Sequence, residues 1–130
     1  MKLLILGGTV FLGRHLVDAA LAAKHEVTVF NRGRGIANLP EAVERLIGDR
    51  PGQLDALRGR RWNVAIDTCG YVPKVVHASA ALLADRVEHY TFISTCSVYR
   101  DMAVQGIDES YPLRSISQKE VGQAERVQAG

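Results

Sequence analysis

Apolar and β-branched residues gather in five short runs along the chain, and glycine-rich or polar segments separate these runs. Each run has the length and composition of a strand that is buried on both faces or packed in a sheet interior. We therefore expect strands at residues 3–6, 25–30, 43–47, 63–67 and 90–94.

Segments with helical periodicity lie between several of these runs. After the first run, residues recur at helical spacing to form an expected apolar stripe: Phe11, Leu12, His15, Leu16, Ala19, Ala20 and Ala23. A second helix begins at Pro73 and reaches about residue 84, and its apolar side consists of Val76, Ala80, Leu83 and Ala84. A shorter helix is expected at residues 52–57. Because strands and helices alternate, the pattern predicts an α/β fold, a Rossmann-like doubly wound parallel sheet with strand order 3-2-1-4-5.

The first strand ends at a glycine pair, Gly7-Gly8, and a helix follows within a few residues. Such a turn leaves backbone N–H groups unpaired at the positive end of the helix, where a pyrophosphate accepts them. Gly7 and Gly13 hold the outer positions of a Gly-x-x-Gly-x-x-Gly pattern, but Val10 holds the middle one, where a side chain narrows the approach to phosphate. Taken alone, the stretch also fits an ordinary turn without a ligand.

The end of the second strand is where this fold recognises the adenosine ribose. An acidic residue there would bind the 2′-hydroxyl, but the segment that follows Phe30 reads Asn31-Arg32-Gly33-Arg34-Gly35. Arginine forks suit a 2′-phosphate. The segment therefore favours NADP over NAD, with a solvated basic loop as the alternative.

Two further segments follow strand ends. Asp49 comes after the third run, where its carboxylate either accepts a hydrogen bond from an adenine amino group or caps the next helix. The loop that begins at Thr68 follows the fourth run. Because the strand order reverses beside the first strand, that loop is expected to face the cofactor crevice.

Composition narrows the class of protein. The 130 residues fit one domain, and the net charge of +2 requires neither a nucleic acid nor a membrane as partner. Cys69 and Cys96 have no zinc-ligand spacing, so we expect no metal and interpret them as reduced thiols of a cytoplasmic protein. An arginine cluster at residues 58–61 precedes Trp62, a potential stacking surface for RNA. We favour a solvated turn, because three arginines without a long basic face give little affinity.

Four motifs occur in the order and spacing of a known family. They are Ile5-Leu6-Gly7-Gly8-Thr9-x-Phe11-Leu12-Gly13, Phe30-Asn31-Arg32-Gly33, Gly48-Asp49 and Ile93-Ser94-Thr95-x-x-Val98-Tyr99. Over residues 1–113 the chain resembles the extended short-chain dehydrogenase/reductases, in the NAD-dependent epimerase/dehydratase group, and is most similar to their isoflavone-reductase-like branch.

The resemblance implies roles for particular residues. The pyrophosphate turn would be lined by Gly7, Thr9, Val10, Phe11, Leu12 and Gly13. Asn31 and Arg32 would hold the ribose or its phosphate, and Asp49 would meet the adenine. Thr68 and Gly70 would border the nicotinamide. Thr95 would be the catalytic hydroxyl that binds the substrate oxygen, although a strand-end threonine also commonly satisfies a backbone group.

The family's chemistry also uses a tyrosine with a lysine four residues later, since the ammonium lowers the pKa of the phenol. The four tyrosines here are followed at that spacing by Val75, Ser94, Ala103 and Ser115. We therefore interpret residues 1–113 as a partial NAD(P)-binding domain and residues 114–130 as a polar tail entering the segment that would carry this pair. The later strands and the substrate lobe would be missing.

The expected function is the NAD(P)-binding portion of an oxidoreductase or epimerase that acts on a hydroxyl or keto carbon of a small-molecule substrate. Alone, the chain would bind cofactor weakly and catalyse no turnover. The alternatives are a non-catalytic nucleotide-binding regulatory module and a weak RNA-binding protein. An unpaired fifth strand would also allow a homodimer to form through the sheet edge.

Overall fold

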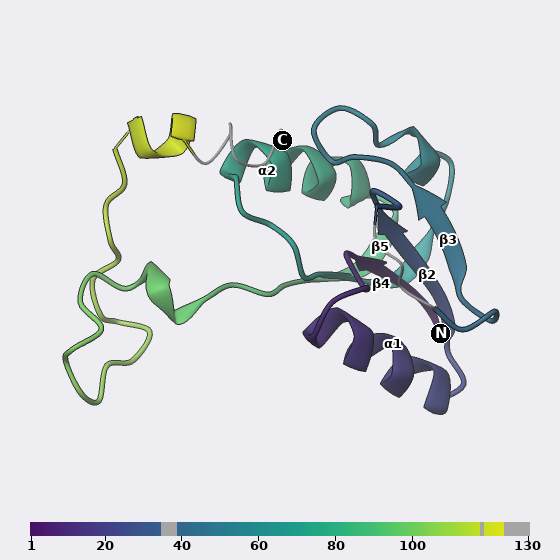
Figure 1. Ribbon diagram of the computed structural model, residues 1–130, viewed down its shortest axis with the longest axis horizontal. Coiled ribbons are helices and arrows are strands. Elements are labelled where there is room, and N and C mark those ends of the chain that lie inside the picture. The colour runs from purple at the N-terminus through teal and green to yellow at the C-terminus, as the bar shows by residue number, and fades with distance from the viewer. Residues whose placement is uncertain (35–38, 118, 124–130) are drawn as a thin grey trace. The chain divides into compact units, whose positions relative to one another are not determined.

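The computed structural model describes residues 1–34, 39–117 and 119–123 (Figure 1). The chain divides into two compact units, residues 1–93 and residues 94–130, and the sheet belongs to the first unit. The predicted loop residue Gly35 and the tail residues 124–130 lie outside the described residues. In the described part of the chain, no helix combines the length and the apolar character needed to cross a membrane.

The first unit is a parallel sheet of five strands with the order β3-β2-β1-β4-β5, which confirms the predicted fold class and strand order. Its elements in chain order are β1 (Lys2–Leu6), α1 (Leu12–Ala22), β2 (Glu26–Asn31), β3 (Glu44–Ile47), the 3₁₀ turn η1 (Asp55–Leu57), β4 (Trp62–Asp67), α2 (Pro73–Leu83) and β5 (Val87–Phe92).

Two predicted elements differ from the observed ones by more than one residue at an end. The last strand begins at Val87 rather than at residue 90, because Val87 pairs with Trp62 and His89 pairs with Val64 along the ladder with β4. The helix expected at residues 52–57 is only the three-residue turn η1: Gly52 has a φ of +96°, a left-handed conformation that excludes it from a helix, and helical backbone begins only at Asp55.

The two faces of β1 are both buried, and each contributes to its own core. Leu3 and Ile5 pack with Val17 of α1 on one face of the sheet. Leu4 and Leu6 pack with Leu83 of α2 on the other face. Figure 1 shows α1 and α2 on opposite sides of the strands. This double burial explains why the strand is an uninterrupted apolar run.

The buried face of α1 differs from the predicted stripe. Gly13, Val17 and Ala20 are its buried residues, whereas Phe11 is 82% exposed and His15 is also exposed. The predicted stripe is therefore correct at Ala20, which is buried, and at Leu16, which packs against the core, and wrong at the exposed residues Phe11, Leu12, His15 and Ala19. The reason is that Gly13 packs directly on the turn before the helix and fixes which side of α1 faces the sheet.

The apolar side predicted for α2 is correct at Leu83, which is buried, and wrong at Ala84, which is exposed. The other buried residue of this helix is polar. Ser79 lies fully buried because its hydroxyl forms hydrogen bonds with the carbonyls of Val75 and Val76 and with the side chain of Arg50.

The second unit contains the 3₁₀ turn η2 (Cys96–Val98) and a loop closed by an antiparallel bridge between Tyr99 and Leu113. Backbone hydrogen bonds from Arg100 to Pro112 (2.9 Å) and from Arg114 to Val98 (2.8 Å) flank the bridge. A helical turn follows at residues 119–123. The predicted domain boundary after residue 113 stays a prediction.

Candidate functional site

The candidate site is the sheet edge where the parallel strands end. Four segments leave the strands there: Gly7-Gly8 after β1, Asn31 at the end of β2, Gly48-Asp49 after β3, and Thr68 after β4. The chain runs outward from β1 to β3 and then returns to β4 on the other side of β1. The gap between the loops of β1 and β4 is the position at which open α/β sheets bind ligands.

The glycine pair makes the turn after β1 possible. Gly7 and Gly8 have φ values of +105° and +76°, in the left-handed region where other residues are strained. The Gly7 N–H donates to the Phe30 carbonyl at 2.9 Å. A Cβ atom on Gly7 would lie 2.5 Å from Thr68 Oγ1, so glycine is what allows the loop after β4 to approach.

The close packing at this turn involves Gly8 and not Val10, which holds the middle position of the predicted glycine pattern. A Cβ atom on Gly13 would lie 2.8 Å from the backbone nitrogen of Gly8. The Val10 side chain is 79% exposed and takes no part in this packing. Helix and turn are therefore held together by two glycines that are five positions apart in the sequence.

The first turn of α1 presents donors to solvent. Phe11 precedes the helix in a left-handed conformation (φ +38°) without a side-chain cap, and its ring makes a T-shaped contact with the His15 ring. Within the described ranges, the N–H groups of Val10, Phe11 and Leu12 donate to no protein acceptor. Three unpaired N–H groups at a helix start suit an anion such as a pyrophosphate.

Asn31 connects the loop after β2 to the glycine turn. Its Nδ2 atom donates to the Gly7 carbonyl at 3.4 Å, and its Oδ1 atom accepts the Gly33 N–H at 2.8 Å. Arg32, the next residue, is exposed. The amide thus holds the loop in place and leaves the guanidinium of Arg32 at the surface of the same edge.

Asp49 lies half-buried in a tight turn after β3. Its N–H donates to Gln53 Oε1 at 3.3 Å, and its carbonyl accepts the Gln53 N–H at 2.8 Å. The alternative in which Asp49 caps the next helix is wrong, because Leu54 precedes η1 there. Among the residues that the structure describes, the Asp49 carboxylate has no hydrogen-bond or ion-pair partner.

Thr68 and Gly70 fix the loop after β4. The Thr68 hydroxyl and N–H both donate to the Leu6 carbonyl, at 2.9 and 3.1 Å. A Cβ atom on Gly70 would lie 2.4 Å from the ring of Phe92, so the glycine is required for the loop to pass over β5. Both residues lie at the predicted edge, and their contact with a nicotinamide stays a prediction.

A buried polar network beneath these loops was missed by the sequence analysis. Arg50 donates from Nη1 and Nη2 to the two carboxylate oxygens of Asp67, both at 2.7 Å, and also donates to Ser79. The Tyr90 hydroxyl donates to Asp67 at 2.7 Å, and the Cys69 N–H does so at 3.2 Å. One signal of this network was present in the sequence, namely an aspartate at the end of an apolar strand. Its arginine partner lies 17 positions away, so the pairing could not be read from neighbouring residues.

Burial and charge shift the ionisation of this network. Burial and the adjacent Asp67 carboxylate raise the pKa of Tyr90 above its usual value. Burial raises the pKa of the Cys69 thiol, although the Arg50 guanidinium partly opposes this shift. For Arg50, burial acts to lower the pKa, and hydrogen bonding and attraction to Asp67 outweigh it, so the side chain remains charged.

Thr95 belongs to the second unit and directly precedes η2. Its exposed hydroxyl accepts the Ser97 N–H at 3.2 Å and donates to Ser97 Oγ at 3.3 Å. This is the backbone-satisfying arrangement that the sequence analysis weighed against catalysis. The catalytic role of Thr95 stays a prediction.

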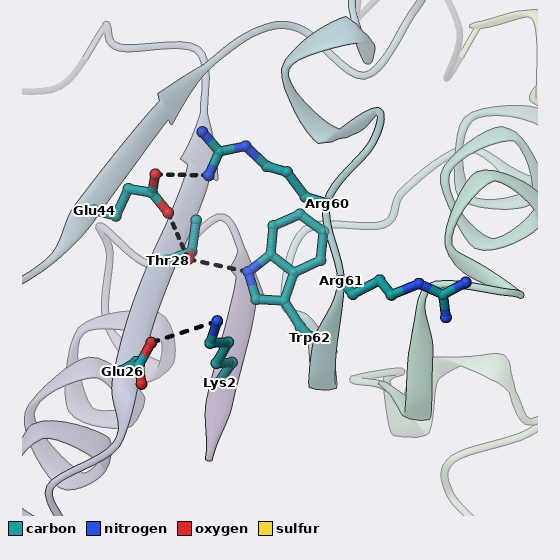
Figure 2. Close-up of a pocket in the computed structure, with 7 residues that line it drawn as sticks. All are labelled: Lys2, Glu26, Thr28, Glu44, Arg60, Arg61 and Trp62. Atoms are coloured by element: carbon teal, nitrogen blue, oxygen red, sulfur yellow. Dashed lines mark hydrogen bonds and ion pairs between the residues drawn. The ribbon is translucent and has the colours of Figure 1, made fainter.

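A hollow of about 240 Å³ lies at the opposite, amino-terminal edge of the sheet (Figure 2). Trp62 is only 6% exposed there, and its indole N–H donates to Thr28 Oγ1 at 3.0 Å. Glu44 accepts from Thr28 at 3.0 Å and from Arg60 at 2.6 Å. The buried indole presents no stacking face, which argues against the RNA-binding alternative.

The chain was compared with protein families, with curated proteins and with solved structures. The profile of the NAD dependent epimerase/dehydratase family matches residues 3–119. No match was found among curated proteins.

Several solved structures share the fold. A UDP-galactose 4-epimerase is 21% identical with a TM-score of 0.77, and the alignment covers 98% of this chain and 49% of that one. The Bordetella bronchiseptica enzyme WbmG, in complex with NAD and UDP, is 14% identical with a TM-score of 0.74, over 99% and 48% of the two chains.

A dTDP-glucose 4,6-dehydratase from Bacillus anthracis, in complex with NAD, is 18% identical with a TM-score of 0.72, over 98% and 49% of the two chains. The chain thus spans about half the length of these structures. The profile match extends from β1 through the glycine turn, the loops after β2, β3 and β4, and most of the second unit. The chain belongs to the NAD-dependent epimerase/dehydratase family.

Proposed function

We propose that the chain is the dinucleotide-binding portion of an epimerase or dehydratase-type enzyme. The observation that carries the proposal is the glycine turn at the point where the strand order reverses between β1 and β4. This is where open α/β sheets bind nucleotides, and a helix with unpaired N–H groups begins beside it. The NAD named in two of the related structures is consistent with the same class of cofactor.

The residues of the edge have the chemistry that a dinucleotide needs. Glycine at positions 7 and 13 lets the loop after β4 and the start of α1 pack closely on the turn, and the unpaired N–H groups of residues 10–12 would bind a pyrophosphate. The Asp49 carboxylate would accept a hydrogen bond from the adenine amino group. Thr68 and Gly70 would border the nicotinamide.

We infer a preference for NADP over NAD from Asn31 and Arg32. An acidic residue at the end of β2 would repel a 2′-phosphate, and Asn31 occupies that position. The exposed guanidinium of Arg32 follows directly and has the fork geometry that binds phosphate oxygens.

In the complete enzyme, the proposed substrate is a small molecule with a hydroxyl or keto carbon, and sugar nucleotides are the class named in the related structures. The bound nicotinamide would supply hydride transfer to or from that carbon. Thr95 would hold the substrate oxygen, and the protein would supply positioning. The isoflavone-reductase-like branch, the cytoplasmic location and the homodimer remain predictions from the sequence.

Calorimetric titration of the chain with NADPH and, separately, with NADH tests the proposal. We expect NADPH to bind more tightly by about tenfold, or about 1.4 kcal/mol. Equal affinities for the two dinucleotides would support the binding site but contradict the preference for NADP. If neither dinucleotide binds to a protein that melts cooperatively, the proposed function is wrong for this chain.

A further inference from the structure

The strongest unassigned feature of the molecule is the pair formed by Arg50 and Asp67, which connects two loops of the candidate site. Arg50 belongs to the turn after β3, and Asp67 is the last residue of β4. Two parallel hydrogen bonds of 2.7 Å join the guanidinium to the carboxylate. Arg50 is 5% exposed and Asp67 is fully buried, so water does not compete for these bonds.

Both ends of the pair are fixed to backbone that leads into the candidate site. On one side, Asp49 and Gln53 close the turn that contains Arg50, and the Arg50 carbonyl accepts the Gly52 N–H at 2.8 Å. On the other side, Asp67 Oδ1 accepts the Cys69 N–H at 3.2 Å and so holds the loop between Thr68 and Gly70. The pair therefore sets the spacing between two loops that are 17 positions apart in the sequence.

Stability alone does not account for such a pair. A buried ion pair loses its hydration on folding, and replacing it with apolar residues of similar size is often neutral or stabilising. Here, the Nε atom of Arg50 is buried and, among the described residues, has no hydrogen-bond partner, which adds to the unfavourable terms. A role in holding the two loops at a fixed distance would explain why both charges lie beneath the edge that binds the ligand.

We propose that Arg50 and Asp67 are positioning residues that fix the distance between the adenine end and the nicotinamide end of the dinucleotide site. Arg50 orients the neighbouring Asp49, which would meet the adenine, and Asp67 orients the loop that would border the nicotinamide. This inference rests on the proposed function. Neither residue touches the dinucleotide in this proposal.

The test compares a ligand that spans both loops with one that reaches only the first. NADPH has both ends, whereas ADP has only the adenine end and the pyrophosphate. Partial unfolding would weaken the two affinities by the same factor, because it removes the site for both ligands. Wrong spacing would weaken NADPH much more than ADP, so the ratio of the two dissociation constants isolates the positioning role.

Two variants are needed. Arg50→Lys keeps the positive charge but lacks the fork that binds both oxygens. The double variant Arg50→Met with Asp67→Leu removes both charges and is expected to remain folded. The matched control applies the same double change to Arg58 and Asp55, an exposed ion pair of 2.9 Å within a single turn that connects no loops.

We expect both Arg50 variants to raise the ratio of the NADPH dissociation constant to the ADP constant by at least about tenfold, and the control pair to leave it unchanged. If the wild type binds NADPH but neither variant changes the ratio, this inference is wrong and the proposed function is unaffected. A wild type that binds neither NADPH nor NADH overturns the proposed function, and the inference with it.

Discussion

The Cα atom of Gly8 lies only 2.7 Å from the position that a Cβ atom on Gly13 would occupy. Gly13 is in α1, where alanine is intrinsically favoured by about 1 kcal/mol. The neighbour here is backbone, which cannot rotate away as a side chain can, and such overpacking costs about 1–3 kcal/mol. We expect Gly13→Ala to lower the free energy of unfolding by up to about 2 kcal/mol, as measured by urea denaturation.

Gly122→Ala is the matched control for that substitution. Gly122 also lies in a helical turn, and a Cβ atom there would meet nothing within 4 Å. Its free energy of unfolding should be unchanged or rise by up to about 1 kcal/mol, because alanine is favoured over glycine in a helix. If Gly13→Ala behaves like this control, the turn and the helix are not packed as described.

Arg32→Ala tests the assignment of the ribose phosphate. The guanidinium is exposed, so solvent weakens its bond to a phosphate, and we expect an effect near the lower end for charged hydrogen bonds, about 1.5 kcal/mol. NADPH affinity should therefore fall by about tenfold, while NADH affinity should remain unchanged. Calorimetry measures both. Arg58→Ala, at another exposed arginine, is the control, and an equal loss for both dinucleotides in Arg32→Ala would contradict the assignment.

The sheet was predictable because its signals are local. The uninterrupted apolar run of β1 requires burial on both faces, and Leu3 and Leu4 do face opposite cores. The glycine turn was also predictable, since Gly7 lies directly after this strand. Strand order followed from alternation of strands and helices, which permits few topologies.

Features that depend on tertiary packing were not predictable. The rotation of α1 is set by the packing of Gly13 on Gly8, which no helical period reports. Ser79 is a polar residue in an apolar helix, and only the distant Arg50 explains its burial. In each case the partner is chosen by the fold, and a single sequence gives no sign of the pairing.

The hydrogen bond from Trp62 to Thr28 gives a prediction about stability at the other edge of the sheet. Thr28→Val keeps the volume but leaves the buried indole N–H without its acceptor, at a cost of about 1–3 kcal/mol. Thr28→Ser retains the hydroxyl and should lose only about 0.8 kcal/mol, for one methyl group. Trp62 is the sole tryptophan, so its fluorescence reports unfolding directly. Equal losses in the two variants would show that the hydrogen bond contributes nothing.

The raised pKa of Tyr90 predicts a loss of stability in alkaline solution. Its phenol is buried and donates to the Asp67 carboxylate, so the folded protein holds this proton more tightly than the unfolded chain does. The stabilisation is complete below the unfolded pKa of about 10 and declines as the pH rises toward the folded value. The slope approaches about 1.4 kcal/mol per pH unit for one group. The Cys69 thiol, whose pKa is raised by burial, adds a decline that starts near pH 8.5.

Tyr90→Phe separates these two contributions. The variant loses a hydrogen bond to a charged group, so at neutral pH its free energy of unfolding should be lower by about 1–2 kcal/mol. It also lacks the titrating phenol, so the difference from the wild type should shrink above about pH 10, when measured by urea denaturation. Tyr71→Phe, at a ring that is 76% exposed, is expected to follow the wild-type profile. Parallel curves for wild type and Tyr90→Phe up to about pH 11 would mean that the phenol ionises equally in both states. The hydrogen bond to Asp67 would then have no energetic preference for the protonated phenol, and Tyr90 would contribute nothing to the network around Arg50 through its ionisation.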